Sequence, residues 1–199
     1  MIQPIWPSIK DLDNARRLYE ENEPRDLFYR IATELITMAI EKRTPISVSE
    51  ALASLLQTWN KSYYRFKKFN NQHFQGIDKL IKKTLPMLLE IRTNKAICTS
   101  EAIKSLFTEY ESVLGPVGAS KCLHLLAPRS FPLWDRAIAE GYGLALKGSG
   151  HNAERYFEFF ELAQEQCQRL GKYRIGERNM LKAIDEYNYM KFTKGLISD

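Results

Sequence analysis

Several absences narrow the possible classes of protein. No apolar stretch approaches the roughly 20 residues that a membrane-spanning helix needs, and the first residues, MIQPIWPSIKDLDNARR, lack the basic start and apolar run of a secretory signal. The three cysteines, Cys98, Cys122 and Cys167, are odd in number and widely spaced. This spacing argues against a disulfide framework, a zinc site and a four-cysteine iron–sulfur cluster. We therefore expect a cytoplasmic protein with no membrane partner and no bound metal.

Common nucleotide-binding and metalloprotease motifs are also missing. The sequence contains no G-x-x-x-x-G-K-[ST], no G-x-G-x-x-G and no H-E-x-x-H. The three histidines, His73, His124 and His151, lie far apart, so each is interpreted as a local hydrogen-bonding residue rather than a metal ligand.

Positive charge is concentrated in one part of the chain. Residues 61–95 contain nine Lys or Arg and two Asp or Glu, whereas residues 1–60 have a net charge of −2 and residues 96–199 a net charge of 0. A localised basic segment is typical of a surface that binds a polyanion. The alternative is a solvated, lysine-rich helix face.

The apolar spacing is helical throughout and shows no convincing strand alternation, which predicts an all-α protein. Ser8 is a candidate helix cap, and Ser47 with Glu50 forms a capping box. The polar segment 70–73 is predicted as a loop, and Pro86 is expected to kink or divide its helix. The predicted helices cover approximately residues 8–21, 25–43, 47–59, 75–92, 100–113, 119–127, 134–146, 153–170 and 176–194.

The stretch LGPVGASKCLHLLAPRSFPLWDR, residues 114–136, is the most informative part of the chain. Gly115 and Gly118 relax steric limits and Pro116 fixes one φ angle, which predicts a compact turn before a helix. At such a helix start the N–H groups of Val117, Gly118 and Ala119 can bind a phosphate. The alternative is a helix–helix turn without a ligand.

Asp135 follows this turn by one short helix and a Pro-containing loop, at the expected start of the next helix. A carboxylate fixed there can stabilise positive charge that develops on a sugar. The alternative is a plain N-cap, for which Asp is a favoured residue.

The turn and the aspartate together resemble the helix-hairpin-helix DNA glycosylase superfamily. Its members have L-P-G-V-G-[RT]-[KS]-T-A, then an apolar helix, then F-P-[IV]-x-D before another helix. The close match covers about 25 residues, and the remaining helices are compatible in number and order. The matching positions are Leu114, Val117 and Gly118 in the first motif and Phe131, Pro132 and Asp135 in the second.

The resemblance implies a role for each matching residue. Asp135 falls on the catalytic aspartate, and the position that is lysine in the bifunctional glycosylase/lyases falls on Ser120. We therefore expect Ser120 in the pocket, as in adenine-type monofunctional members. Lys121 lies about 100° further round the helix and is expected to face DNA phosphates with the turn residues Gly115, Val117, Gly118 and Ala119. Pro116 in place of the first hairpin glycine, and a shorter loop before Asp135, depart from the pattern.

Aromatic and amide residues of the segment 55–65, together with Trp134 beside Asp135, are candidates for a base pocket. In related glycosylases the helix at this point supplies residues that fill the gap in the duplex or line the pocket. Stacking and hydrogen bonding to an extruded base would use such side chains, and the alternative is that they are core or surface residues. The candidates are Gln57, Trp59, Asn60, Tyr64 and Trp134.

The resemblance implies an all-α, two-lobed helix-hairpin-helix glycosylase-like fold. One lobe would comprise residues 26–128, and the other residues 1–25 plus 129–199, with Asp135 in the cleft. The implied function is monofunctional excision of a damaged, mismatched or modified base from DNA by a monomer that needs no cofactor, although the hairpin carbonyls could hold a structural monovalent cation. The alternatives are a non-catalytic helix-hairpin-helix DNA-binding protein and a glycosylase-fold enzyme that acts on modified nucleotides.

Overall fold

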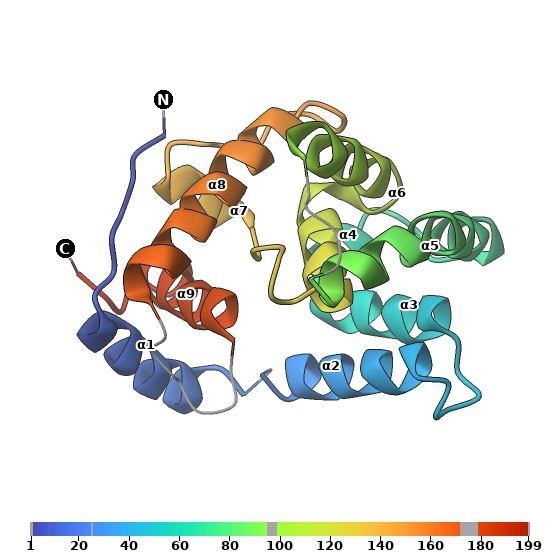
Figure 1. The fold of residues 1–199 in the computed structure, drawn as a ribbon, viewed down its shortest axis with the longest axis horizontal. Coiled ribbons are helices and arrows are strands. Elements are labelled where there is room, and N and C mark those ends of the chain that lie inside the picture. The colour runs from blue at the N-terminus through green and yellow to red at the C-terminus, as the bar shows by residue number, and fades with distance from the viewer. Residues whose placement is uncertain (1, 25, 95–98, 172–178, 199) are drawn as a thin grey trace.

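The computed structural model describes residues 2–24, 26–94, 99–171 and 179–198. Within these ranges every regular element is helical, which confirms the predicted all-α class (Figure 1). The elements are α1 (Ile9–Asn22), α2 (Asp26–Ile40), α3 (Val48–Trp59), α4 (Lys61–Tyr64), α5 (Asn71–Arg92), α6 (Ser100–Leu126), α7 (Arg136–Gly141), α8 (Ala153–Leu170), α9 (Met180–Asn188) and the π-helix η1 (Tyr189–Thr193).

Local sequence signals set several helix starts as predicted. Ser8 and Ser47 each cap a helix, and both form a complete capping box, with Asp11 and Glu50 respectively. In each box the serine hydroxyl accepts a backbone N–H and the acidic side chain accepts the N–H of the serine. Two backbone donors that a helix start leaves unpaired are satisfied in this way.

Other boundaries differ from the prediction. The predicted loop at 70–73 is wrong, because Asn70 caps α5 by accepting the backbone N–H of His73 at 2.9 Å. Pro86 lies within α5 and does not divide it. The helix that was expected to continue to residue 146 ends at Gly141. The expected start of the last helix at 176 lies outside the described residues.

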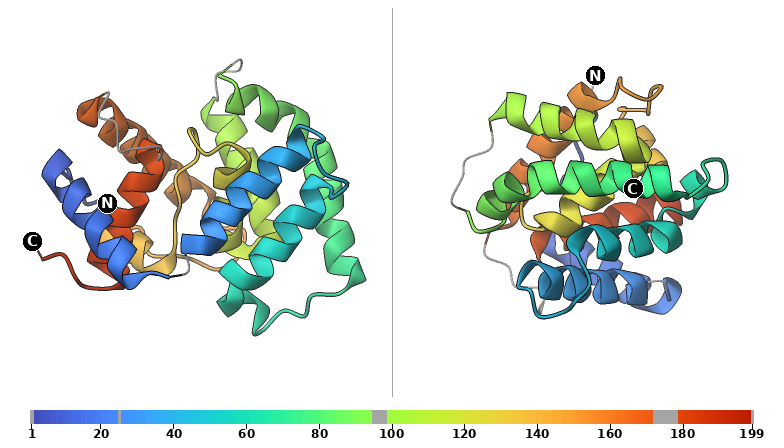
Figure 2. Two further views of the ribbon diagram at one scale, coloured as in Figure 1. Left: turned by 90° about the horizontal axis from the view of Figure 1, so that it is seen from below. Right: turned by 90° about the vertical axis from the view of Figure 1, so that its right-hand side faces the viewer.

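One large apolar core joins most of the helices. Its buried side chains come from α2 to α8, so it continues past residue 128, where the sequence suggested a boundary between lobes. A smaller cluster joins α1 to α9 through Leu12, Ala15, Ala183, Ile184 and Tyr187. Figure 2 shows α1 and α9 side by side, apart from the group formed by α2, α3, α5 and α6.

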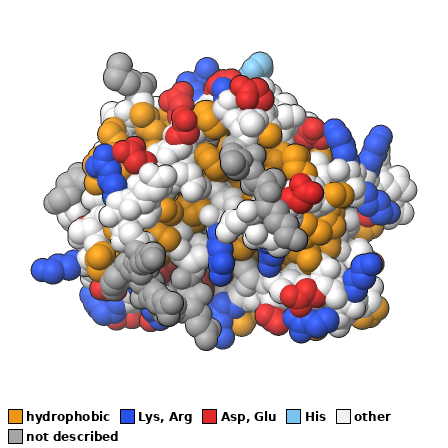
Figure 3. Space-filling view, viewed as in Figure 1, with side chains coloured by type: hydrophobic (Ala, Val, Ile, Leu, Met, Phe, Trp, Pro, Cys, Tyr) orange, Lys and Arg blue, Asp and Glu red, His pale blue; other side chains and the backbone are white. Residues whose placement is uncertain are grey.

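The described part of the basic window, residues 61–94, forms α4, the loop that follows it, α5 and the turn at its end. On the face drawn in Figure 3, Lys and Arg side chains gather along the right-hand edge, where α5 lies in Figure 1. In the part of the chain that the structure describes, no helix is long and apolar enough to cross a membrane.

Candidate functional site

The predicted turn is a sharp break within α6. Gly115 has φ +70° and ψ 169°, which interrupts the helix so that its two halves run in different directions. A Cβ atom at this position would lie 3.0 Å from the ring of Tyr63, so the left-handed backbone and the aromatic contact both favour glycine. The second half of α6 then begins at Pro116, a residue suited to the first turn of a helix.

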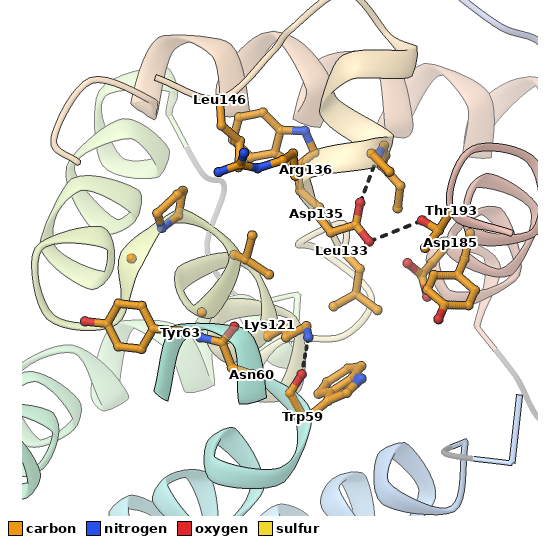
Figure 4. Close-up of a pocket in the computed structure, with 18 of the residues that line it drawn as sticks. Trp59, Asn60, Tyr63, Lys121, Leu133, Asp135, Arg136, Leu146, Asp185 and Thr193 are labelled. Atoms are coloured by element: carbon orange, nitrogen blue, oxygen red, sulfur yellow. Dashed lines mark hydrogen bonds between the residues drawn. The ribbon is translucent and has the colours of Figure 1, made fainter. Parts of the chain in front are cut away.

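A cavity of about 770 Å³ lies beside this turn. Its walls come from α1, α6, α7, α9, η1 and the end of α3, elements that are far apart in the sequence. The volume falls in the range of small-molecule sites in proteins, roughly 300–1,000 Å³. Figure 4 shows Lys121 and Asp135 on facing sides of the space.

Asp135 is fixed at the start of α7, as predicted. One carboxylate oxygen, Oδ1, accepts the backbone N–H of Ile138 at 2.9 Å, and the other, Oδ2, accepts the Thr193 hydroxyl at 3.4 Å (Figure 4). The side chain therefore caps α7 and faces the cavity at the same time.

The environment of Asp135 raises its pKa above the ordinary value. Burial is the main cause, and the negative charge of Asp185 acts in the same direction. The N–H of Ile138 and the charge of Lys121 oppose the shift without cancelling it. A carboxylate with a raised pKa is a better proton acceptor when ionised than an ordinary surface aspartate.

The structure reverses the expected placement of Ser120 and Lys121. Ser120 is completely buried: its hydroxyl donates to the Trp134 carbonyl at 2.8 Å and accepts the Trp134 N–H at 3.2 Å. Lys121 instead lines the cavity, and its amino group donates to the Trp59 carbonyl at 2.5 Å. Adjacent helical residues point about 100° apart, and the cavity lies on the side of Lys121. Ser120 therefore holds the loop that precedes Asp135.

Fewer backbone N–H groups of the turn reach the cavity than the sequence predicted. Gly115, Val117 and Gly118 line the cavity. Ala119 is completely buried and is not among the lining residues, so the expectation that its N–H reaches a phosphate is wrong. A Cβ atom at Gly118 would lie only 2.8 Å from the side-chain nitrogen of Asn60, because the α3 end packs directly on the turn.

Two of the five predicted pocket residues lie elsewhere. Gln57 is exposed and borders a separate shallow depression beside α3. Tyr64 packs against Tyr63, Phe69 and His73, and its hydroxyl is 3.1 Å from His73 Nε2. Both predictions fail because α3 and α4 turn these side chains away from the cavity.

The other three predicted pocket residues do line the cavity. Trp59 stands beside Lys121, whose ammonium lies 4.7 Å from the indole centroid, and Asn60 contacts the turn. Trp134 is 1% exposed, and its ring packs among Phe107, Tyr156 and Phe159. Among the described residues its indole N–H has no hydrogen-bond acceptor, an arrangement that costs folding free energy.

The carbonyl that precedes the turn is already occupied. Val113 O accepts the Tyr63 hydroxyl at 2.9 Å and the Lys67 amino group at 3.4 Å. These donors compete with any monovalent cation at this carbonyl. The described residues also contain no group of three or more His, Cys, Asp or Glu that could hold a metal ion.

A buried charge network behind the cavity had no counterpart among the predicted site residues. Lys182 is 1% exposed, and its amino group lies 2.9 Å from Asp185, 3.8 Å from Glu186 and 3.2 Å from the Tyr19 hydroxyl. Burial opposes the charge of Lys182, but these neighbours together raise its pKa above the ordinary value. Asp185 and Tyr19 also line the cavity, so the network reaches the site.

The cavity combines an acidic lining with aromatic walls. Four lining residues are acidic and two are basic, so a phosphate is disfavoured inside, whereas developing positive charge is favoured. The acidic residues are Glu23, Asp135, Glu140 and Asp185, and the basic residues are Lys121 and Arg136. Trp59, Tyr19 and Tyr189 supply flat aromatic surface for a planar group.

No protein-family model matches the chain, and no curated protein or solved structure matches it either.

Proposed function

We propose that this protein is a DNA glycosylase with the two-lobed helix-hairpin-helix fold, and that it removes a damaged, mismatched or modified base by hydrolysis. The observation that carries the proposal is the placement of Asp135. It is fixed at a helix start and faces a cavity of about 770 Å³, whose lining also includes the Gly115 turn. The motifs that resemble the superfamily thus meet at one site.

The chemistry assigned to Asp135 is that of a buried carboxylate beside a sugar. As the bond between C1′ and the base nitrogen breaks, its electron pair goes to the base and positive charge develops on the deoxyribose. Asp135 stabilises that charge and accepts a proton from the water whose oxygen bonds to C1′. The leaving base takes up a proton from solvent and Asp135 returns its proton to solvent, so the products are a free base and an abasic sugar. Burial of Asp135 strengthens both effects, because the surrounding dielectric is low.

The acidic lining of the cavity is consistent with a substrate whose base and sugar lie inside the cavity and whose phosphates lie outside it. The base and sugar of an extruded nucleotide would enter, while the phosphates stay outside on exposed basic residues of the window such as Arg65 and Lys68. Extrusion costs a few kcal/mol, which contacts to the DNA backbone help to offset.

The test is an excision assay on duplexes that each contain one of a panel of lesions and mismatches, followed by alkali to cleave abasic sites. We expect strand cleavage on at least one duplex. Asp135→Asn should lower turnover at least a hundredfold while DNA affinity is retained, because the lost charge acts mainly in the transition state.

The same assay separates the alternatives. DNA binding without excision on any duplex would favour the non-catalytic DNA-binding protein. Hydrolysis of free modified nucleotides by a protein that does not bind duplex DNA would favour the glycosylase-fold enzyme that acts on modified nucleotides. Excision by Asp135→Asn within a few-fold of the wild-type rate would reject Asp135 as the catalytic group.

The position of Lys121 favours a second candidate, a bifunctional glycosylase/lyase. A lysine in the cavity can in principle attack C1′, as such enzymes require. Its amino group, however, donates to the Trp59 carbonyl and lies over the indole ring, and both contacts favour the charged, non-nucleophilic form. We therefore retain hydrolysis by water. Borohydride should trap no protein–DNA adduct; an adduct that disappears in Lys121→Ala would establish the lyase instead.

A further inference from the structure

Asp185 is a carboxylate of the cavity that has no part in the chemistry assigned to Asp135. It belongs to α9, and its side chain is 12% exposed. Figure 4 shows it on the same side of the cavity as Asp135, next to Thr193. Its Oδ2 accepts a hydrogen bond from Lys182 at 2.9 Å, whereas its Oδ1 accepts none from the residues that the structure describes. One acceptor of Asp185 is therefore left for a molecule in the cavity.

The side chain of Asp185 is held from behind by a cation that has no access to water. Lys182 is 1% exposed, and its ammonium also lies 4.4 Å from the ring centroid of Tyr19 and 4.8 Å from that of Tyr29. A buried ion pair is seldom more stable than apolar side chains of the same volume, so stability alone does not account for it. The pair fixes a carboxylate in the cavity wall, and a fixed acceptor loses little conformational entropy on binding.

Flat aromatic surface lies next to this carboxylate. Tyr19 and Asp185 contact the same ammonium, at 3.2 and 2.9 Å, and Tyr189 lies one helical turn beyond Asp185. The rings of Tyr19 and Tyr189 are 5.9 Å apart between centroids, and all three residues line the cavity. A planar group can therefore contact a tyrosine ring while one of its edges faces the carboxylate.

The chemistry of a carboxylate decides which edge of a base can face it. A carboxylate only accepts hydrogen bonds, so its partner must present an N–H group. Adenine and cytosine carry an exocyclic amino group, whereas hypoxanthine and uracil carry a carbonyl oxygen at the same ring position. The oxygen would lie against the negative charge of Asp185 and leave its Oδ1 without a donor.

We propose that Asp185 accepts a hydrogen bond from the exocyclic amino group of the base, so that the cavity selects amino bases over their oxo counterparts. The substrate class is adenine, cytosine or a derivative that keeps this group. The inference rests on the proposed function and names the kind of base that is removed. Asp135 acts on the sugar and Asp185 determines specificity. Discrimination by such a group is strong, because an unsuitable base leaves a buried polar atom without its partner.

The experiment measures how tightly the wild-type protein binds three free bases that differ at one ring position. Adenine carries an amino group there, purine a hydrogen atom and hypoxanthine a carbonyl oxygen. Binding is followed by tryptophan fluorescence, because Trp59 and Trp134 line the cavity. We expect adenine to bind at least about tenfold more tightly than hypoxanthine, with purine between them. The assay needs neither DNA nor catalysis.

Asp185→Asn gives a result that a merely structural role would not produce. The amide of asparagine can donate to a carbonyl oxygen, so the variant should bind adenine about tenfold more weakly and hypoxanthine more tightly than wild type does. Glu161→Gln is the matched control, because it removes one negative charge at an exposed position of α8 that does not line the cavity. It should keep the wild-type ratio. If Asp185→Asn does not fold, the three bases on wild type decide the matter.

The outcomes separate this inference from the proposed function. Equal affinities of wild type for adenine and hypoxanthine, or no binding of any base, would overturn the role of Asp185. A ratio that folded Asp185→Asn leaves unchanged would do the same. Excision from duplexes that contain uracil or hypoxanthine, but from none with an amino base, would overturn the inference while the glycosylase stands. A preference for adenine without excision from any duplex would support the base site and reject the glycosylase.

Discussion

The two walls of the cavity are built in different ways. The wall at the α6 turn is made of backbone and aromatic contacts: Gly115 and Gly118 allow Tyr63 and Asn60 to approach closely. The wall at α1 and α9 is made of buried charge, with Lys182 between Asp185 and Glu186. The first wall depends on shape and the second on electrostatic balance. They should therefore respond differently to substitution and to pH.

Replacing Lys182 and, separately, Lys121 with methionine tests the contrast between the two walls. Lys182→Met removes a fully buried cation together with its ion pairs to Asp185 and Glu186, so we expect a loss of about 3–5 kcal/mol in the free energy of unfolding. Lys121→Met removes a hydrogen bond and a cation–π contact at a partly exposed site, and should cost roughly 1–2 kcal/mol. Urea unfolding measures both. Equal costs would mean that the buried network does not dominate its wall.

His124 should make the stability depend on pH. Its ring is buried: Nδ1 donates to the Phe131 carbonyl at 2.7 Å, and Nε2 therefore accepts from the Tyr29 hydroxyl at 3.0 Å. Burial lowers the pKa of His124 from 6.5 to about 4, so the unfolded chain binds more protons between these values. The resulting stabilisation is complete above pH 6.5 and is lost as the pH falls towards 4, by about 3 kcal/mol.

The measurement is the free energy of unfolding at several pH values from 4 to 7. His124→Gln can keep both hydrogen bonds without titrating, so it should flatten most of the dependence. The pKa of His73 is also lowered, mainly by burial, and contributes a small slope of the same sign, whereas the raised pKa of Asp135 contributes a slope of the opposite sign. A slope that is unchanged in His124→Gln would assign the pH dependence to other groups.

Gly115→Ala tests the wall built on shape. An alanine at φ +70° is strained, and its Cβ would contact the Tyr63 ring at 3.0 Å, so we expect a loss of about 1–3 kcal/mol. Gly150→Ala is the matched control, because Gly150 has φ +86° and open space where its Cβ would lie. The difference between the two variants isolates the contact with Tyr63. Equal losses would show that backbone strain alone matters.

The smallest expected effect is a gain of stability in Asp135→Asn. The folded-state pKa of Asp135 is raised, so its ionised form is disfavoured in the folded protein, and stability falls as the pH rises from 3.8 through that pKa. Asparagine is also a favoured N-cap and can still accept the N–H of Ile138. We expect the melting temperature to rise by about 2–4 °C at pH 7 and the gain to vanish in acid. A lower melting temperature at pH 7 would contradict this account.

Local signals in the sequence predicted most of the fold. The capping boxes at Ser8 and Ser47 depend on residues three positions apart, and the cap at Asp135 depends on its own helix. Such contacts can be inferred from sequence spacing because the partners are neighbours in the chain. The turn at Gly115 was predictable for the same reason, since Gly and Pro restrict the backbone wherever they occur.

The parts of the site that were missed depend on packing between distant segments. The motif match placed Ser120 in the pocket, but the direction of the second half of α6 brings Lys121 there. Lys182 resembles an ordinary surface lysine in the sequence, and its contact with Tyr19 spans 163 positions. Spacing along the chain contains no information about such partners. One signal of this burial was present in the sequence: Lys182 lies between two apolar residues, Leu181 and Ala183.

The π-helix η1 makes the site sensitive to chain length at one point. A π-helical turn has one more residue than the α-helical turn it replaces, so it is equivalent to a single inserted residue. It follows α9 directly and places Thr193 on Asp135. If the same five residues took α-helical spacing, Thr193 would be rotated away from Asp135, whereas deletion of one residue before Thr193 would give α-helical spacing with Thr193 close to its present direction. The contact between the last helix and Asp135 therefore depends on the helix type of this one turn, which also contains the buried Met190 and the Phe192 ring that packs on Tyr142.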